Sequence, residues 1–386
     1  MSSSFVKSSV CNVDLHIVQK YDLKRRIGKG AYGIVWKAFE RKNKTPVAVK
    51  KIYDAFRNPT DAQRTFREIA YLQEFRNHPN IVKLLNVHRA NNNTDIYLVF
   101  EYVETDLHKC IKREKILQDI HKRFIIYQLL KALKYIHSGN VIHRDLKPPN
   151  ILINSQCHCK IADFGLARSV APNQNEDEPV LKAMLTDYIA TRWYRAPEVL
   201  ACGCILGEML LGKPLFPGSS TVNQLELIIN TLGPVSPNDV DSVCSGYGSS
   251  LLKQAPPPSK VTSLSSLLPT VSADALDLLN RFLTLNPNHR ITAADALEHS
   301  YVQMQFLDAC CVLQYKINHS KPRCIEVTSK LRLSFCDVSG FSSYFIYYMV
   351  NYSMLILKNF LDFSSLRKVN SAKTSRNGVD LFTFKK

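Results

Sequence analysis

The sequence predicts an α+β protein with two lobes, a small β-rich lobe first and a larger helical lobe after it. Residues 47–50, 81–85 and 96–100 are short runs rich in β-branched, aromatic and other apolar residues, which predict strands. Between residues 124 and 137, apolar residues recur at helical spacing instead. The change of character falls at residues 101–103, which we interpret as a hinge between the lobes.

The composition is that of a globular protein with a strong positive charge. The chain has 386 residues, enough for two or three structural units with a buried core. Hydrophobic residues make up 45% and charged residues 22%, and the formal net charge is +17. Such a charge can attract nucleic acid, anionic lipid or acidic partners. The sequence shows no zinc-finger spacing, RNA-binding aromatic motif or basic heptad region, which argues against specific nucleic-acid binding.

Cysteine usage indicates a reducing environment. The eleven cysteines form no C-x-x-C pair, and Cys157 and Cys159 are too close together for a usual zinc half-site. The N-terminus has no apolar signal peptide, and residues 1–20 are interpreted as a leader. We therefore expect reduced thiols in a cytoplasmic or nuclear protein.

The functional prediction is based mainly on a polar stretch in the middle of the chain. Residues 143–150 read His-Arg-Asp-Leu-Lys-Pro-Pro-Asn, and Asp-Phe-Gly follows at residues 163–165. Apolar runs at residues 151–153 and 160–162 predict a pair of short strands around a turn. The polar side chains that flank these strands are therefore expected to lie close together.

The candidate catalytic residues in this stretch are Asp145 and Lys147, and the candidate metal ligands are Asn150 and Asp163. Phosphoryl transfer from Mg-ATP requires a carboxylate that takes the proton of the incoming hydroxyl, a lysine that offsets charge, and oxygen ligands for Mg²⁺. A chance match in a polar loop is the alternative. Eight ordered positions with an Asp-Phe-Gly sequence at the right distance argue against it.

A glycine-rich loop near the N-terminus contains the pattern G-x-G-x-x-G. With its flanks it reads Ile27, Gly28, Lys29, Gly30, Ala31, Tyr32, Gly33, Ile34 and Val35. Strand-type residues follow it, so we predict that the loop joins two antiparallel strands rather than opening a dinucleotide-binding helix. Glycines allow the backbone to close over phosphates. Taken alone, the pattern is also compatible with a plain glycine-rich hairpin.

Lys50 lies at the end of the apolar strand at residues 47–50, where a charge is costly unless it is paired. The helical spacing of Phe66, Ile69 and Leu72 predicts a helix that carries Glu68. We expect Glu68 to pair with Lys50, which would then hold the α- and β-phosphates of ATP. A solvated glutamate on a surface helix is the alternative.

The predicted hinge provides the remaining ATP-binding candidates, Glu101, Val103 and Asp106. Backbone groups of this segment would hydrogen-bond adenine, and Asp106 would face the ribose. Phe100 would border the pocket behind the adenine. Each of these roles depends on the presence of a nucleotide site.

Thr186 and Tyr188 flank Asp187 in a predicted loop, after an acidic segment at residues 173–178. Phosphorylation of these hydroxyls would add negative charge and strong hydrogen-bond acceptors. They are the candidate modification sites. An exposed polar turn is the alternative.

As an ordered set, these motifs resemble a eukaryotic protein kinase. The Thr-x-Tyr sequence before Ala-Thr-Arg-Trp-Tyr-Arg-Ala-Pro-Glu, at residues 190–198, is similar to the mitogen-activated protein kinases, and most like their atypical branch. The resemblance implies the two-lobed kinase fold, with an N-lobe at residues 21–102 and a C-lobe at residues 103–302. Residues 303–386 would form a basic tail outside it.

The resemblance also implies an activity and roles for the site. It implies transfer of the γ-phosphate of ATP, with Mg²⁺, to serine or threonine residues that are followed by proline in proteins of intracellular signalling. Asp145 would accept the substrate proton, Lys147 would contact the γ-phosphate, and Asn150 and Asp163 would bind Mg²⁺. The Thr-x-Tyr hydroxyls would be phosphorylated by an upstream kinase or by the protein itself.

The chain departs from the kinase pattern after Glu198. Kinases have a loop there, then a long buried helix whose Asp-x-Trp start holds the backbone of the catalytic loop; this chain continues at once with residues 199–206. Each buried N–H group left without a partner costs about 1–3 kcal/mol. We therefore expect a shortened helix, and a catalytically impaired, pseudokinase-like binding module is the alternative function. The resemblance further implies that Arg290 pairs with Glu198.

Helices are expected at residues 210–232 and 273–282, with a Pro- and Ser-rich insert at residues 255–268 between them. Beyond residue 302 the resemblance ends and no acidic docking patch is visible. Residues 340–357 are uncharged and aromatic-rich. A membrane span needs roughly 18 or more apolar residues, and the polar residues of this segment argue against one.

Overall fold

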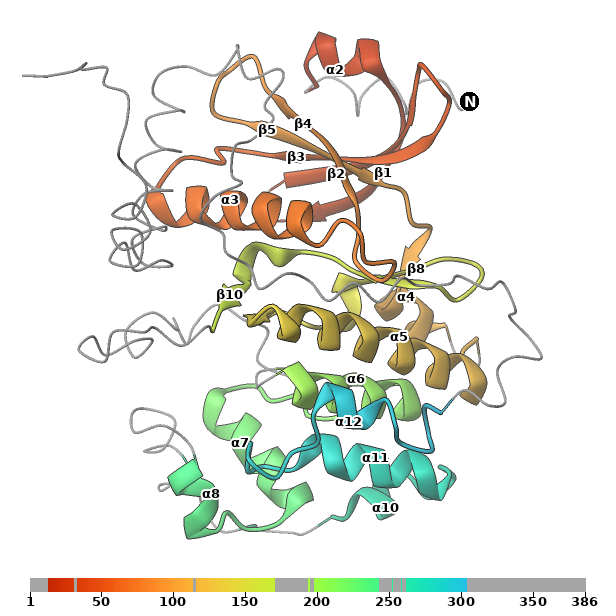
Figure 1. Cartoon of the computed structure of the whole chain (residues 1–386), viewed down its shortest axis with the longest axis vertical. Coiled ribbons are helices and arrows are strands. Elements are labelled where there is room, and N and C mark those ends of the chain that lie inside the picture. Colours follow the sequence, from red (N-terminus) through yellow and green to blue (C-terminus); the bar gives the residue numbers. More distant parts are fainter. Residues whose placement is uncertain are drawn as a thin grey trace, which may run out of the picture. The chain divides into compact units, whose positions relative to one another are not determined.

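A five-stranded antiparallel sheet forms the first lobe (Figure 1). Its strands are β1 (Tyr21–Gly30), β2 (Gly33–Glu40), β3 (Pro46–Ile52), β4 (Leu84–Arg89) and β5 (Ile96–Glu101). They lie side by side in the order β1-β2-β3-β5-β4. The predicted β-rich lobe at the start of the chain is confirmed.

The computed structural model describes residues 13–30, 33–113, 116–170, 194, 198–242, 252, 258 and 262–303. These residues belong to one unit, formed by Met1–Val170 and Asp187–Cys324; a second unit comprises Ala171–Thr186 and Ile325–Lys386. The predicted phosphorylation sites Thr186 and Tyr188, and residues 304–386 of the predicted tail, lie outside the described residues. Within the described part, no helix is long and apolar enough to cross a bilayer.

The glycine-rich loop joins β1 and β2, which pair antiparallel and meet at Gly30 and Gly33. The prediction of a loop between antiparallel strands is therefore confirmed. Glycine is required at position 33, because a Cβ there would lie 1.9 Å from the carbonyl oxygen of Lys51 on β3. The loop residues Ala31 and Tyr32 lie outside the described residues.

A short helix, α2 (Leu15–Lys20), packs on the sheet core before β1 begins. Its Ile17 is fully buried in a cluster with Trp36, Val49 and Tyr97. The backbone N–H of Asp14 also donates to the hydroxyl of Tyr97 at 3.1 Å. The sequence analysis assigned no structure to this segment, because six residues are too few to show helical periodicity.

Helix α3 (Pro59–Glu74) is the helix predicted to carry Glu68, and it extends beyond the predicted residues at both ends. The side chain of Asn58 caps its first turn by accepting from the N–H of Asp61, and Pro59 occupies the first helical position. Proline is favoured there because its missing N–H has no helical partner. In Figure 1, α3 lies along one face of the sheet.

The second lobe is mainly helical. Its helices are α4 (Leu107–Lys112), α5 (Asp119–Ser138), α6 (Glu198–Leu211), α7 (Thr221–Leu232), α8 (Pro237–Ser242), α10 (Leu264–Leu267), α11 (Ala273–Leu283) and α12 (Ala293–Ala296). Short strands precede α6: β6 (Thr105–Asp106), β7 (Val141–Ile142), β8 (Ile151–Ile153), β9 (Cys159–Ile161) and β10 (Arg168–Ser169). Strands β8 and β9 pair antiparallel, as predicted.

Helix α6 begins directly at Glu198 and continues without a break to Leu211. Residues along it, such as Cys202, Ile205 and Leu206, are fully buried, and it packs against α5 and α11. Gly203 allows the close approach to α11, since a Cβ there would lie 2.8 Å from Cβ of Phe282. This helix therefore forms part of the core of the second lobe.

Two predictions about secondary structure were wrong. The single helix predicted at residues 210–232 is divided, because α6 ends at Gly212, which has a left-handed φ of 75°. Pro214 and Pro217 lack the N–H that a helix needs, and the chain becomes helical again only at α7, which Ser220 caps. The strand predicted at residues 81–85 starts later, at Leu84, and Ile81 forms only an isolated bridge to Ile161.

Arg123 near the start of α5 connects three segments of the helical lobe: the first turn of α5, the start of α11 and the chain at Tyr301. Its guanidinium lies 2.6 Å from the carboxylates of both Asp119 and Asp274, donates to the carbonyl of Tyr301 at 3.1 Å, and stacks 4.2 Å from the centre of the Tyr301 ring. Burial alone would raise the pKa of Asp274, but hydrogen bonds from Arg123 and Ser272 lower it to about 2. The pair therefore stabilises the fold when Asp274 is ionised.

We predict that Asp274→Asn lowers the free energy of unfolding by about 2 kcal/mol near neutral pH. Because the folded pKa lies below the unfolded value, this stabilisation is present above about pH 4 and is lost as the pH falls through about 2. Urea unfolding of both proteins between pH 2 and 7 measures the difference. Asp241→Asn, at an exposed position, is the control, and a difference that does not change with pH would contradict the prediction.

Candidate active site

Asp145, Lys147 and Asn150 form a connected cluster, as the sequence predicts. Nζ of Lys147 lies 2.8 Å from Oδ2 of Asp145. Nδ2 of Asn150 donates to the same oxygen at 3.0 Å and to the backbone carbonyl of Asp145 at 2.9 Å. The 3₁₀ turn at Pro148–Asn150 places the amide there. The Asp145 carboxylate is thus fixed by two donors in a buried position.

His143 joins this cluster to the Asp163 segment. Its Nδ1 accepts from the backbone N–H of Asp145 at 3.2 Å, and Nε2 lies 3.1 Å from the carbonyl of Ala162. The ring is fully buried, with its centre 4.7 Å from that of Phe164. This role of His143 was not predicted, although its place two residues before Asp145 was a usable signal.

Lys50 and Glu68 form the predicted ion pair. Nζ of Lys50 lies 2.7 Å and 2.9 Å from the two carboxylate oxygens of Glu68, and the Glu68 side chain is only 6% exposed. Burial alone would lower the pKa of Lys50, but the carboxylates of Glu68 and Asp163 outweigh it, so the pKa is raised. The ammonium group remains charged, and β3 is tied to α3.

Asp163 lies next to this pair and has a left-handed backbone, with φ of 66°. Its carboxylate is 30% exposed, and Oδ2 lies 3.9 Å from Nη2 of Arg64 on α3. Burial alone would raise the pKa of Asp163, but the charges of Lys50 and Arg64 lower it instead. The group is therefore an anionic oxygen donor that is partly open to solvent.

The donors present fit a magnesium ion that is shared with a nucleotide. Among the described residues, no group of three or more His, Cys, Asp or Glu side chains could hold a metal ion by itself. Mg²⁺ typically takes one or two carboxylates together with substrate phosphates and water. Asp163 offers a carboxylate, and Asn150 uses its Nδ2 for Asp145, which leaves its amide oxygen for a cation.

The glycine-rich strands are next to Lys50. Val35 pairs with Lys50 across β2 and β3, and Ile34 pairs with Lys51. The register therefore places the end of the loop beside the ion pair. The predicted ATP-binding residues at the described positions of this loop are Ile27, Gly28, Lys29, Gly30, Gly33, Ile34 and Val35.

The carboxylate of Glu101 is bound to other groups of the protein. Oε1 accepts from the backbone N–H of Lys83 at 2.8 Å and lies 3.0 Å from Nζ of Lys160 on β9. Nζ of Lys160 also donates to the carbonyl of Pro79 at 2.8 Å. Any contact of Glu101 with adenine would therefore come from its backbone, as for Val103.

Asp106 caps helix α4. Its carboxylate accepts from the N–H of Lys109 at 3.0 Å and pairs with the Lys109 ammonium at 2.7 Å. This capping role is already sufficient to explain an aspartate at the position. Contact of Asp106 with a ribose remains a prediction.

A buried polar network connects the two lobes behind the site. Nδ2 of Asn80 donates to Oε1 of Gln128 at 3.0 Å and to the carbonyl of Cys159 at 2.9 Å. The N–H of Ile161 donates to the carbonyl of Asn80 at 2.8 Å. These bonds hold β9, and hence the following Asp163, against the segment that leads into β4. Neither amide belongs to a motif, so nothing in the sequence alone points to either of them.

Comparison with known proteins identifies the family. The protein kinase domain model matches residues 21–302.

The chain belongs to the protein kinase family.

Its similar relatives are mitogen-activated protein kinases. The chain is 57% identical to mitogen-activated protein kinase 15 of Xenopus laevis over 303 residues, which cover 75% of this chain and 51% of the relative. It is 55% identical to extracellular signal-regulated kinase 2 of Dictyostelium discoideum, over 75% of this chain and 81% of the relative. Mitogen-activated protein kinase 15 of Caenorhabditis elegans is 47% identical over 82% of this chain and 70% of the relative. The chain thus spans about half the length of the frog relative.

Near helix α6, the hydroxyl of Tyr194 donates to the buried carboxylate of Glu208. Arg290 donates to the carbonyls of Thr284 and Leu285, each at 2.8 Å. The predicted pair of Arg290 with Glu198 stays untested, because the side chain of Glu198 lies outside the described residues.

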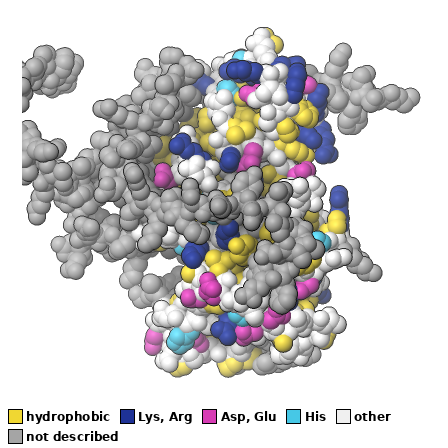
Figure 2. Space-filling model, turned by 45° about the vertical axis from the view of Figure 1, so that its right-hand side comes forward, with side chains coloured by type: hydrophobic (Ala, Val, Ile, Leu, Met, Phe, Trp, Pro, Cys, Tyr) yellow, Lys and Arg dark blue, Asp and Glu magenta, His cyan; other side chains and the backbone are white. Residues whose placement is uncertain are grey.

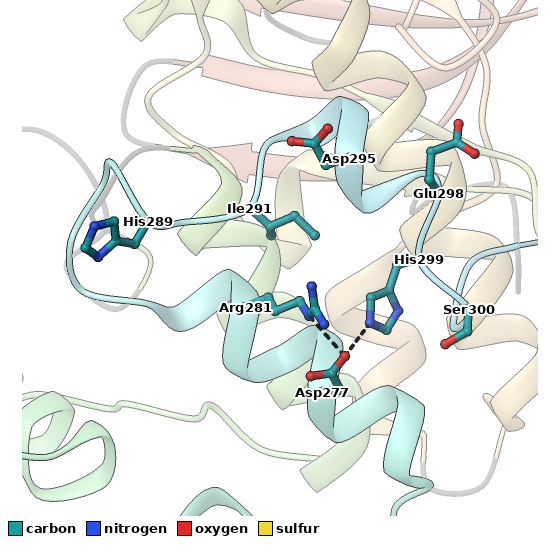
Figure 3. Close-up of a pocket in the computed structure, with 8 residues that line it drawn as sticks. All are labelled: Asp277, Arg281, His289, Ile291, Asp295, Glu298, His299 and Ser300. Atoms are coloured by element: carbon teal, nitrogen blue, oxygen red, sulfur yellow. Dashed lines mark hydrogen bonds and ion pairs between the residues drawn. The ribbon is translucent and has the colours of Figure 1, made fainter.

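A cavity of about 510 Å³ lies on the helical lobe, apart from these residues. Figure 3 shows Asp277 of α11 between Arg281 and His299, to which it is bound at 3.0 Å and 2.8 Å. The charges at its centre thus neutralise one another, and it contains none of the predicted site residues. Figure 2 shows Lys and Arg side chains grouped over the upper part of the described surface, at the level of the sheet.

We predict that Glu101→Gln changes nucleotide affinity by less than about twofold and lowers the free energy of unfolding by about 0.5–1 kcal/mol, because it removes only a partly exposed ion pair with Lys160. Fluorescent-nucleotide binding and urea unfolding measure the two quantities. A tenfold loss of affinity would show instead that the carboxylate contacts the nucleotide.

Proposed function

We propose that this protein is an ATP- and Mg²⁺-dependent serine/threonine protein kinase of the mitogen-activated type. The observation that carries the proposal is the Asp145 cluster, in which one buried carboxylate is held by Lys147 and Asn150. His143 connects it to the segment of Asp163, which lies beside the Lys50–Glu68 pair. The groups that we propose as base, phosphate-binding cation and metal ligands are thus neighbours.

Asp145 is proposed as the base. Its Oδ2 is held by the ammonium of Lys147 and the amide of Asn150, so the carboxylate has a fixed direction in which to receive a hydroxyl. Accepting the proton of a serine or threonine hydroxyl makes the oxygen a better nucleophile. Lys147 carries the positive charge that offsets the transferring phosphate.

Lys50 is proposed to bind the α- and β-phosphates. Its raised pKa keeps it charged, and Glu68 orients it from α3. The glycine-rich strands β1 and β2 would cover the phosphates, and backbone groups at Glu101 and Val103 would meet the adenine. The N-lobe would comprise residues 21–102 and the C-lobe residues 103–302.

Asn150 and Asp163 would hold Mg²⁺ through their side-chain oxygens. When bound there, the ion neutralises phosphate charge during transfer. The charge of Lys50 acts on the carboxylate of Asp163 and helps to keep its pKa low, so the group is available as an anionic ligand. Substitution of either side chain is therefore expected to affect nucleotide binding in the presence of the metal.

Similarity to mitogen-activated protein kinases supports finer proposals about partners. We propose protein substrates with Ser/Thr-Pro sites, and activation by phosphorylation of Thr186 and Tyr188, by an upstream kinase or by the protein itself. A cytoplasmic or nuclear location is consistent with such partners. Phosphorylation of a peptide library by the whole chain tests the proline preference.

The uninterrupted start of α6 at Glu198 supports one competing function, a catalytically impaired binding module. No aspartate occurs on α6 that could hold the catalytic loop as the Asp-x-Trp segment does in other kinases.

We predict that inserting a full helix start with its loop raises peptide phosphorylation and the melting temperature. Equal activity with and without the insertion would remove the impaired-module proposal.

We predict that Asp145→Asn reduces phosphoryl transfer by about 10²–10⁴-fold, because general-base catalysis is lost while the two hydrogen bonds remain possible. Incorporation of labelled γ-phosphate into a Ser-Pro or Thr-Pro peptide measures the rate, and nucleotide binding confirms that the pocket is intact. Asp22→Asn, a partly exposed aspartate on β1, serves as the matched control. Equal rates for wild type and Asp145→Asn would show that Asp145 is not the base.

A further inference from the structure

Arg64 on α3 extends over the Asp163 turn. Its Nη2 lies 3.9 Å from Oδ2 of Asp163. Its stem lies against Gly165, because a Cβ added there would be 2.8 Å from Cγ and 3.0 Å from Nε of Arg64. Contacts along the stem and at the tip therefore hold the guanidinium over this turn.

The position of Arg64 follows from the helix that carries Glu68. The two residues are four apart, so they lie on the same face of α3, one turn from each other. Glu68 binds Lys50, and Arg64 approaches Asp163. One helix face thus presents an anion to the cation of β3 and a cation to the anion of the Asp163 turn.

Arg64 approaches Oδ2 of Asp163, and the proposed function makes this carboxylate a metal ligand. The two side chains are 25% and 30% exposed, so their attraction is weakened by solvent and can be overcome by a divalent ion. Mg²⁺ binds its oxygens at about 2.0–2.1 Å with strict octahedral geometry. A guanidinium beside the same oxygen repels that ion and blocks part of its coordination shell.

We propose that Arg64 competes with Mg²⁺ for Asp163, so that metal binding at the nucleotide site requires the guanidinium to withdraw from this carboxylate. The inference rests on the proposed function, which assigns Asp163 as a metal ligand. It adds a residue of α3 that sets the metal concentration at which the site fills. Arg64 acts through Asp163 and is a positioning residue.

Metal binding to the whole chain saturated with a non-hydrolysable ATP analogue tests the inference, because the donors of this site fit an ion that is shared with a nucleotide. Mn²⁺ is the probe, and its binding is measured by the relaxation of water protons, with Asp163→Asn defining the signal that does not come from this site. We expect Arg64→Gln to bind Mn²⁺ about two- to fivefold more tightly than wild type, as removal of a partly exposed ion pair predicts. Arg64→Lys, which keeps the charge, is expected to bind nearer the wild-type value.

The matched control is Arg57→Gln. Arg57 precedes α3, is 68% exposed and pairs with Asp61 at 3.3 Å, so its removal also takes one positive charge from this helix region. We expect no change in Mn²⁺ affinity for this variant. An equal increase in both glutamine variants would show a general effect of net charge and would overturn the inference.

Unchanged or weaker Mn²⁺ binding in Arg64→Gln would also overturn it, as would an Arg64→Lys variant that binds as tightly as Arg64→Gln. Melting temperatures of the variants verify that each is folded, and Arg64→Met, which also removes the charge, takes the place of Arg64→Gln if that variant is unstable. Failure of the proposed function can be distinguished from failure of this inference. The former would appear as absent phosphoryl transfer by the wild-type protein, whatever the Mn²⁺ affinity of Arg64→Gln.

Discussion

The ion pair between Lys50 and Glu68 is the interaction on which the rest of the site depends. It joins β3 to α3 through two short contacts, with a glutamate that is almost fully buried. A buried carboxylate without its partner would be strongly destabilising. The pair therefore fixes the rotation of α3, and this rotation in turn decides where Arg64 lies relative to Asp163.

A second set of constraints holds the other half of the site. His143 bonds both to the backbone of Asp145 and to the residue before Asp163, and the Asn80–Gln128 network fixes β9. These groups do not react, yet they determine the distances between the groups that do. Neutral hydrogen bonds suit this task because buried polar groups with satisfied partners are rigid.

The sequence predicted the residues of the candidate site more completely than the residues that hold them in place. Ordered motifs predicted the candidate residues Lys50, Glu68, Asp145, Lys147, Asn150 and Asp163, whose roles stay a prediction. The contacts of Arg64, Asn80 and Gln128 were not predicted, since they depend on which segments meet in space and carry no local pattern. The helix predicted at residues 210–232 failed for a related reason: apolar spacing continues across Gly212, but the left-handed φ there ends the helix. Helix α6, which begins at Glu198, is buried along most of its length.

Lysine labelling tests most directly whether these charges form a nucleotide site. Lys50 and Lys51 are neighbours on β3, but Lys50 pairs with Glu68 and Lys51 pairs with Asp95. The whole chain would be treated with an acyl-phosphate derivative of ATP, which transfers its acyl group to lysines near the bound phosphates, and modified residues would be located by mass spectrometry. The account predicts labelling of Lys50 that excess ATP suppresses, with Lys51 unlabelled. Equal labelling of both lysines, unaffected by ATP, would contradict it.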